Sequence, residues 1–485
     1  MNKKKQIPLQ KIRLRFPPSP TGPLHIGNAR TILFNYLFAQ KNKGATVLRI
    51  EDTDKERSKL EWVQNIIDEL QWLGITWDEG PDIGGKFGPY KQSQRLDIYK
   101  KYLEKLLVEG KAYYCICTTE ELEAKRQDQQ SRGLAPKYDG KCRNAKNTSG
   151  IIRFKVENKK VVFNDLVRGD VEFDMGLVGD IVIAKNLQEP LYHFAVVVDD
   201  YEMQISHIIR GEDHLSNTPK QILLQEALGF FQPTYGHVPL LLNPDKSKMS
   251  KRAGDVAVSD YHQQGYLPEA LINFMVLLGW NPGTEKEVFS LKDLIKEFSI
   301  EKVQKAGAVF NVQKLDSINA YYIRQKTASQ LMKLCLAHLP ELAQKIPKKT
   351  LEKIIEIHKA RMKKLSDIAA MADYFFKETL EYDKNILSWK EMGESDVKDA
   401  LDASLKVITG IKKWDIKTIE KTLLEKSSEF NGQKNYPLEN RGYLLWPLRV
   451  ALSGKSASAG PFEIAEILGK EKTLQRIQDA IKILL

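Results

Sequence analysis

Cysteine is scarce in this sequence, and long hydrophobic runs are missing. Four cysteines in 485 residues are too few for the disulfide framework of a secreted protein. Apolar runs such as Leu271 to Trp280 are far shorter than the ~20 residues that a membrane-spanning helix needs. The basic start, Met1 to Lys5, is followed by Pro8 and charged residues rather than by the apolar core of a signal peptide. These absences predict a soluble, cytoplasmic protein with no membrane partner.

The chain does contain enough hydrophobic material for roughly three folded domains, because 42% of its 485 residues are apolar. It carries 74 Lys and Arg residues against 63 Asp and Glu, a formal net charge of +11. A basic excess of this size predicts a polyanionic partner, although charge alone does not say which one.

The apolar pattern changes along the chain. The first part predicts an α/β fold, with strands at Ile12 to Phe16 and Thr46 to Ile50 around a helix at Ile26 to Gln40. Short runs predict further strands at 151–156, 161–163, 180–184, 195–198 and 237–242. From about residue 325 the apolar residues follow a three-to-four spacing, and glycine is absent between Gly307 and Gly393. The last third is therefore predicted to be all-α.

A proline- and glycine-rich segment separates the first predicted strand from the first helix. It reads Pro-Ser-Pro-Thr-Gly-Pro-Leu-His-Ile-Gly-Asn over residues 18–28. The start of a helix presents unpaired N–H groups and the positive end of its dipole, which favour an anion. The two glycines would let a flat ligand approach the backbone, and His25 could donate to a phosphate oxygen. Taken alone, the segment is better explained as a loop with a capping histidine.

A second segment, residues 246–252, reads Lys-Ser-Lys-Met-Ser-Lys-Arg and holds four cations. Such a cluster is unfavourable unless an anion lies among the charges. Triphosphate is a natural candidate, since lysines can neutralise the charge that grows on a pyrophosphate leaving group. Taken alone, the segment is better explained as a solvated basic loop, which is the commoner fate of such runs.

Together, the two segments resemble the HIGH and KMSKR signatures of class I aminoacyl-tRNA synthetases. Arg15 to Gly27, Arg49 to Asp54, Ile209 to His214 and Lys248 to Arg252 resemble bacterial glutamyl-tRNA synthetase in particular. The resemblance runs from about residue 12 to the end of the chain. It implies a Rossmann-like parallel sheet with an inserted acceptor-binding domain, followed by an all-α anticodon-binding domain. Asn28 departs from the pattern, which has a second histidine there.

The resemblance also implies five regions. They are a first catalytic half (1–112), an inserted connective domain (113–188), a second catalytic half with the KMSKR loop (189–255), a stem-contact region (256–325) and an anticodon-binding domain (326–485).

The implied site residues fall into two groups. The ATP-binding set, in which His25, Lys248 and Lys251 are the catalytic residues, is Pro18, Thr21, Gly22, His25, Gly27, Asn28, Lys248, Met249, Ser250, Lys251 and Arg252. The glutamate-binding set is Arg15, Ser19, Glu51, Tyr192 and Arg210. Arginine suits a carboxylate because its planar fork makes two parallel charge-assisted bonds. Without the resemblance, each arginine would be explained as an ordinary surface charge.

The implied reaction has two steps and no protein nucleophile. L-glutamate and ATP, with Mg²⁺, give glutamyl adenylate and pyrophosphate, and glutamate then passes to the terminal adenosine of tRNA-Glu. Whether tRNA-Gln is also a substrate stays open. Family likeness implies a monomer and a need for bound tRNA during activation.

Three cysteines in the predicted insertion form a separate pattern. Cys115 and Cys117 are followed by Tyr138 and Cys142. Thiolates at this spacing in a cytosolic chain fit a structural Zn²⁺ site. Three reduced cysteines without a metal explain the spacing equally well. Some relatives place a histidine two residues after the third cysteine, where this chain has Asn144. Others use a tyrosine four residues before it, which Tyr138 matches.

Two other functions compete with this interpretation. A glutaminyl-type synthetase must bind a neutral amide, and both Arg210 and the helical C-terminal third disfavour it. A catalytically inactive RNA-binding relative is disfavoured by the intact His25, Lys248 and Lys251.

Overall fold

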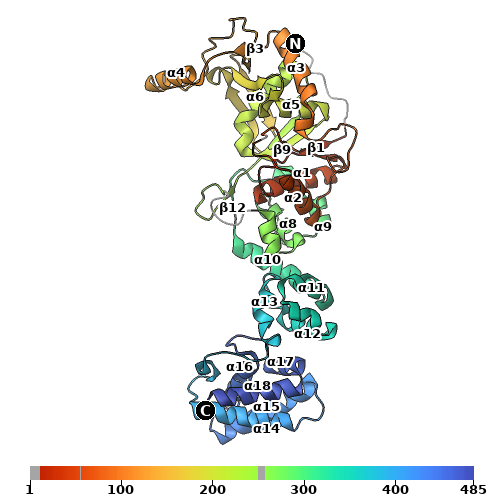
Figure 1. Cartoon of the computed structure of the whole chain (residues 1–485), viewed down its shortest axis with the longest axis vertical. Helices are drawn as coiled ribbons and strands as arrows, with labels where there is room; N and C mark the ends of the chain where they lie inside the picture. Colours follow the sequence, from red (N-terminus) through yellow and green to blue (C-terminus); the bar gives the residue numbers. More distant parts are fainter. Residues whose placement is uncertain (1–10, 55, 250–256, 485) are drawn as a thin grey trace. The chain divides into compact units, whose positions relative to one another are not determined.

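The computed structural model describes residues 11–54, 56–249 and 257–484. The chain forms two compact units, of which the first holds residues up to 263 and 268–318, and the second holds 264–267 and 319–485. Among these described residues, all the sheets lie in the first unit, and the second unit is helical (Figure 1). Each unit is described by itself below.

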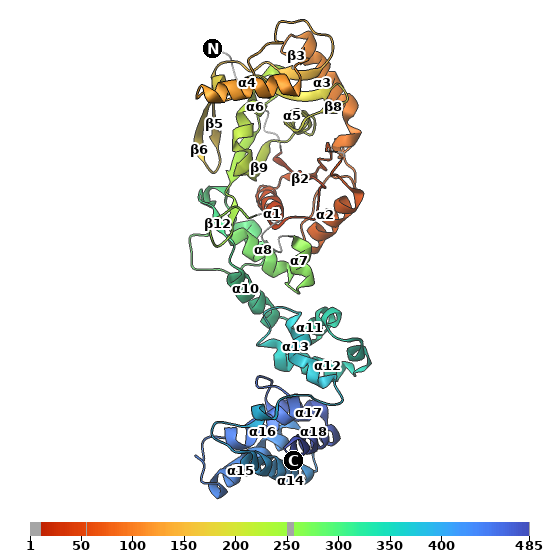
Figure 2. The same ribbon diagram turned by 60° about the vertical axis from the view of Figure 1, so that its left-hand side comes forward.

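The first unit opens with the predicted strand, helix and strand. β1 (Arg13–Phe16) runs parallel to β2 (Ala45–Leu48), and α1 (Ile26–Lys41) connects them. α1 begins at its cap His25, whose Nδ1 accepts from the backbone N–H of Gly27 at 2.9 Å. α2 (Leu60–Trp72) follows β2 and lies near α1 in both ribbon views (Figure 2).

A second sheet, in the order β6-β5-β10-β9, completes the parallel core. β9 (His207–Gly211) and β5 (Lys160–Asp165) both run parallel to β10 (Thr234–Val238), and β6 (Gly169–Asp174) is antiparallel to β5. Ser206, just before β9, donates its backbone N–H to the carbonyl of Arg13 in β1 at 3.0 Å. β1, β2, β9 and β10 therefore end near one another, the edge at which parallel sheets bind ligands.

A third, antiparallel sheet has the order β3-β4-β7-β8, with β3 at Ala112–Cys115, β4 at Ile151–Phe154, β7 at Ile181–Asn186 and β8 at Glu189–Pro190. The remaining elements of this unit are α3 (Leu96–Val108), α4 (Thr119–Ser131), α5 (Tyr192–Glu202), α6 (Thr218–Leu228), β11 (Leu241–Leu242), α7 (Val258–Gln263), α8 (Pro268–Leu277), α9 (Leu291–Glu297) and β12 (Ala308–Val309).

The structure corrects two predicted strands. Ala195 to Val198 lies inside α5, where all four side chains are buried, so the run is apolar because the helix is enclosed. The run from His237 to Leu242 is divided into β10 and β11. Pro239 lies at the break, where it cannot donate to a sheet ladder.

The second unit confirms the predicted helices. α10 (Val312–Gln325) crosses from the first unit into the second. The others are α11 (Ala328–Cys335), α12 (Lys348–Lys359), α13 (Asp367–Ala372), α14 (Glu394–Thr409), α15 (Ile416–Gln433), α16 (Gly442–Ser453), α17 (Pro461–Leu468) and α18 (Lys470–Ile483). Gly469, at a φ of 82°, ends α17 and begins α18, because the left-handed region suits glycine.

Candidate active site

A pocket of about 440 Å³ lies at the shared carboxyl edge of β1, β9 and β10. All five predicted glutamate-binding residues line it. So do the predicted ATP-binding residues Pro18, Thr21, Gly22, His25, Gly27, Asn28, Lys248 and Met249. Ser250, Lys251 and Arg252 lie outside the described residues.

One end of the pocket is the start of α1. Since His25 Nδ1 accepts from the N–H of Gly27, the neutral imidazole carries its proton on Nε2. A Cβ atom at position 27 would lie 3.2 Å from that Nδ1 atom, so glycine preserves the cap. This arrangement makes His25 a hydrogen-bond donor beside the N–H groups of the first helical turn.

The segment 246–249 returns to the same pocket. Met249 donates its backbone N–H to the carbonyl of Leu241 in β11 at 3.0 Å. Lys248 Nζ lies 3.4 Å from the carboxylate of Asp213, and the Lys248 side chain is 59% exposed. The ammonium group is therefore held loosely by one partner and can turn to a ligand.

The other end of the pocket is built from buried charges. Arg15 Nε donates to Asp200 Oδ1 at 3.1 Å, and Arg49 Nη1 donates to the same oxygen at 2.8 Å. Arg49 Nη2 also donates to Glu51 at 2.9 Å. Burial raises the pKa of Glu51 above its ordinary value, although Arg49 and Arg15 oppose the shift. A further cation beside Glu51 would favour its ionised form.

Arg210 lies near the carboxyl end of β9 and lines the pocket. Its side chain is buried, and Nη2 donates to Thr218 Oγ1 at 2.7 Å while Nε donates to His237 Nε2 at 3.1 Å. Arg210 Nη1 and Arg15 Nη1 are both buried without a hydrogen-bond partner among the described residues. A buried guanidinium donor left unpaired is costly, so each nitrogen fits an incoming acceptor such as a carboxylate.

Asp213 and His214 also line the pocket, although neither was predicted from the sequence as a site residue. His214 Nδ1 lies 3.2 Å from the hydroxyl of Tyr192, the first residue of α5. Burial and the neighbouring Arg210 lower the pKa of His214 to about 4, so its imidazole is neutral at pH 7. Both residues lie in the segment that carried the resemblance, but no pattern marked their roles.

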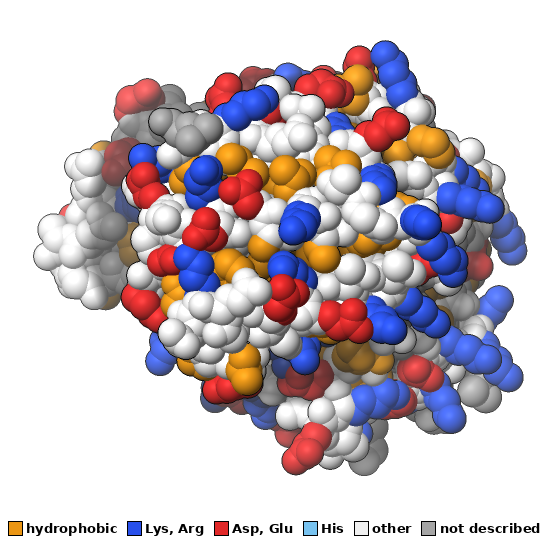
Figure 3. Space-filling model, turned by 90° about the horizontal axis from the view of Figure 1, so that it is seen from below, with side chains coloured by type: hydrophobic (Ala, Val, Ile, Leu, Met, Phe, Trp, Pro, Cys, Tyr) orange, Lys and Arg blue, Asp and Glu red, His pale blue; other side chains and the backbone are white. Residues whose placement is uncertain are grey.

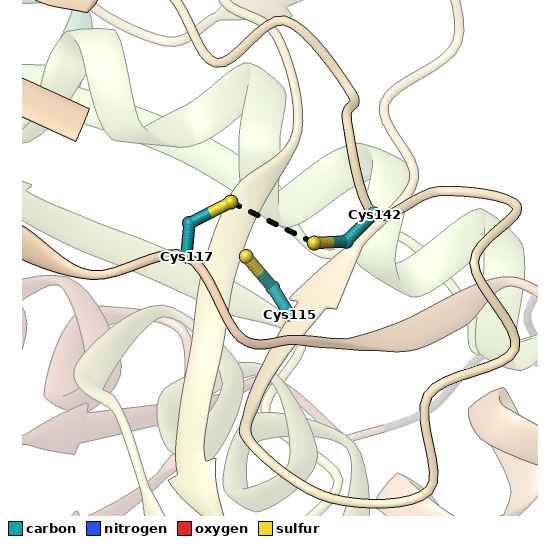
Figure 4. Close-up of side chains that lie close together, drawn as sticks. All are labelled: Cys115, Cys117 and Cys142. Atoms are coloured by element: carbon teal, nitrogen blue, oxygen red, sulfur yellow. Dashed lines mark hydrogen bonds between the residues drawn. The ribbon is translucent and has the colours of Figure 1, made fainter. Parts of the chain in front are cut away.

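The cysteine cluster lies elsewhere, in and beyond β3. The three sulfurs point toward one another (Figure 4) and all lie within 4.8 Å. Cys117 Sγ is 3.6 Å from Cys142 Sγ, and the Tyr138 hydroxyl is 3.4 Å from Cys115 Sγ and 3.5 Å from Cys117 Sγ. Zn–S bonds of about 2.3 Å in a tetrahedron place sulfurs roughly 3.8 Å apart, so these four side chains fit a Zn²⁺ site.

A larger cavity, of about 930 Å³, lies between the antiparallel sheet and α6. It has basic residues in its lining, including Lys111, Arg143 and Lys155. None of its lining side chains appears among the buried, unpartnered polar groups of the described chain. The smaller pocket is lined by three arginines with such a nitrogen, Arg15, Arg30 and Arg210, and is therefore the better candidate for a specific small-molecule site.

Two families match this chain. The family "tRNA synthetases class I (E and Q), catalytic domain" matches residues 11–317, and the family "Anticodon binding domain" matches residues 330–481. The parallel sheet with its pocket and the helical second unit thus define a class I tRNA synthetase.

Similar proteins show to which family within this class the chain belongs. The glutamate–tRNA ligase of Carboxydothermus hydrogenoformans is 44% identical, over 96% of this chain and 99% of that protein. That of Desulforamulus reducens is 41% identical, over 97% and 100%. A crystal structure of a glutamate tRNA ligase from Elizabethkingia meningosepticum, in complex with its amino acid, superimposes with a TM-score of 0.86 at 33% identity, covering 98% of this chain and 100% of that one. The chain belongs to the glutamate–tRNA ligase family.

Among the described residues, no helix combines the length and the apolar character that crossing a membrane requires.

Proposed function

We propose that the pocket activates L-glutamate with ATP and then charges tRNA-Glu, with the two buried arginines binding the amino acid's carboxylates. The unpartnered Nη1 atoms of Arg15 and Arg210 carry this proposal. Arg210 receives the side-chain carboxylate, and Arg15 supplies a second guanidinium at the same end of the pocket. The carboxylate of Glu51 receives the ammonium group, which offsets its burial.

In the first step, an oxygen of the α-carboxylate attacks the α-phosphorus of ATP. The new C–O–P linkage forms as the bond to the β-phosphate oxygen breaks, and pyrophosphate leaves. His25 Nε2–H and the first turn of α1 stabilise the charge on the α-phosphate. Lys248 and Lys251 neutralise the departing pyrophosphate, and Mg²⁺ accompanies the nucleotide.

In the second step, a ribose hydroxyl of the terminal tRNA adenosine attacks the activated carbonyl carbon, and AMP leaves. The protein's contribution in both steps is position and electrostatics, because neither step needs a protein nucleophile. The inserted region contacts the acceptor end and the helical second unit contacts the anticodon, with the five-region division of the chain as proposed from its sequence.

We also propose that Cys115, Cys117, Tyr138 and Cys142 hold a structural Zn²⁺. Its contribution would be to the folding of this part of the insertion, because four protein ligands leave no open coordination position.

Arg210→Ala tests the central assignment. Loss of a charged hydrogen bond, worth about 1.5–3 kcal/mol, predicts a fall of roughly 10- to 100-fold in kcat/KM for glutamate. The assay is glutamate-dependent ATP–pyrophosphate exchange with tRNA present, and the KM for ATP should stay near its original value. Lys100→Ala, at a partly exposed lysine of α3 outside the pocket and outside the insertion, is the control. Unchanged exchange in Arg210→Ala would contradict the assignment.

A further inference from the structure

Buried side chains that the proposed reaction does not use hydrogen-bond Nε and Nη2 of Arg210, the atoms other than the unpartnered Nη1. Arg210 in β9 lies opposite His237 in β10 in the parallel register of the two strands. The imidazole of His237 is fully buried, and its Nε2 accepts from Arg210 Nε at 3.1 Å. Thr218 Oγ1 lies 3.0 Å from the same Nε2 and accepts from Arg210 Nη2 at 2.7 Å. One edge of the guanidinium is therefore fixed, and Nη1 remains for a ligand.

A carboxylate sets the tautomer of this imidazole. Asp165 Oδ2 lies 2.6 Å from His237 Nδ1. Asp165 Oδ1 meanwhile accepts the backbone N–H groups of Val167, Arg168 and His237 at 2.9, 2.9 and 3.1 Å. An acceptor at Nδ1 places the proton of the neutral ring there, which leaves the lone pair on Nε2 for Arg210.

The electrostatic surroundings favour this protonation state. Burial alone would raise the pKa of Asp165, but hydrogen bonds from His237 and from backbone N–H groups outweigh it and lower the pKa below its ordinary value. Burial lowers the pKa of His237, although Asp165 opposes the shift. The pair is thus an ionised carboxylate and a neutral imidazole at pH 7.

We propose that Asp165 and His237 are positioning residues that hold Arg210 with Nη1 directed at the side-chain carboxylate of the substrate. The inference rests on the proposed function, since it takes Arg210 as the ligand of that carboxylate. Neither residue touches the substrate. With the proton on Nε2 instead, two N–H groups would face each other across 3.1 Å, and the guanidinium would have to turn away. Asp165 belongs to β5, so a strand predicted as part of the insertion would act on amino-acid selection through His237 and Arg210.

Two substitutions at position 237 separate hydrogen bonding from packing. The amide of glutamine reaches the place of Nε2 and offers an oxygen acceptor, whereas leucine fills similar space with none. We expect His237→Leu to raise the KM for glutamate by about tenfold or more, as the loss of a buried hydrogen bond predicts, with the KM for ATP changed less than about twofold. We expect His237→Gln to restore the KM for glutamate to within about threefold of the original.

Asp165→Asn tests the tautomer. The asparagine oxygen can keep the backbone N–H bonds, but its NH₂ group then faces His237 Nδ1 and moves the ring proton to Nε2. The KM for glutamate should rise as in His237→Leu. Kinetics are measured by pyrophosphate exchange with tRNA on the full chain, and thermal unfolding confirms that each variant is folded at the assay temperature.

Arg210→Ala in the same assay makes the outcomes distinguishable. If Arg210→Ala leaves the KM for glutamate unchanged, the proposed function of Arg210 fails, and this inference fails with it. If Arg210→Ala raises that KM but His237→Leu and His237→Gln behave alike, or raise the KM values for glutamate and ATP together, the positioning role alone is overturned.

Discussion

At the scale of single residues, the site is organised around guanidinium groups that are only partly satisfied by the protein. Arg15 is 1% exposed and Arg210 is 5% exposed, yet each keeps one nitrogen without a partner among the described residues. Arg15 Nε donates to Asp200, and Arg210 Nε and Nη2 donate to His237 and Thr218. This division gives each arginine a rigid side and a receiving side, which lowers the cost of ordering when a carboxylate binds.

Asp200 is the residue on which two of the buried arginines depend. Its Oδ1 accepts from Arg15 and from Arg49, and its side chain is 3% exposed. Asp200→Asn removes the charge while it keeps the shape, so Arg15 loses this counter-ion and Arg49 keeps only its pairs with Glu51 and Asp199. We expect the free energy of unfolding to fall by about 3–5 kcal/mol, measured by denaturant titration.

Asp128→Asn is the matched control, because its pair with Arg132 is 63–65% exposed and should contribute about 0–1 kcal/mol. Equal stability losses in the two variants would show that the buried charge network does not stabilise the fold as described.

The sequence predicted the glutamate- and ATP-binding residues through their resemblance to a family, and the described members of both sets line one pocket. It did not predict roles for Asp200, His214 or His237, because no local pattern of residues marks a single acid or histidine for such a role. Their importance depends on contacts between strands and helices far apart in the sequence, which only the fold brings together.

At the scale of elements, part of α5 was wrongly predicted to be a strand because the helix is buried. The run Ala195 to Val198 reads as a strand because apolar and β-branched residues are continuous, but helix α5 is buried around this stretch. β5 was predicted as a strand of the insertion, and it pairs with β10 of the parallel sheet. Periodicity describes the exposure of each element and does not specify its partner.

The contact between α2 and α7 contains a carboxyl group that should titrate near neutrality. Burial, with the nearby Asp68 and Asp260 carboxylates, raises the pKa of Glu69 to about 7. His262 of α7 stacks on Trp72 of α2 at 4.1 Å, and its Nδ1 lies 3.9 Å from Glu69 Oε2. An ionised Glu69 is therefore unfavourable in the folded state.

The sign of the pH effect follows from this raised pKa. Between pH 4.5 and 7 the unfolded chain loses the Glu69 proton before the folded chain does, so stability falls as pH rises through this window. Glu69→Gln removes the effect. We expect the variant to gain melting temperature relative to the original chain at pH 8 compared with pH 5, by calorimetry. The same difference at both pH values would contradict the raised pKa.

The cysteine cluster makes a further prediction for one element and its following loop. If Cys115, Cys117, Tyr138 and Cys142 hold Zn²⁺, elemental analysis of purified protein should find about one zinc per chain, and a chelator should lower the melting temperature. Cys117→Ser should abolish zinc binding, while Cys335→Ser, at a buried cysteine of α11, should retain it. A fully stable, active protein without zinc would discard the site.

At the scale of the whole molecule, the composition indicated that the partner is a polyanion, but it did not indicate which polyanion. The net charge of +11 suits a polyanion such as tRNA. Lys and Arg side chains nevertheless lie beside Asp and Glu side chains over the face drawn in Figure 3. The change from a part with sheets to a helical last third was predicted, because the change from an α/β pattern to helical spacing is visible in the sequence.

We propose that one pocket binds the phosphates at the start of α1 and the amino acid's carboxylate at Arg210. A crystal structure with a non-hydrolysable sulfamoyl analogue of glutamyl adenylate would show both contacts. We expect the side-chain carboxylate within hydrogen-bond distance of Arg210 Nη1, and the sulfamoyl group beside His25 and the first turn of α1. A carboxylate bound away from Arg210, or a sulfamoyl group out of reach of His25, would contradict the claim.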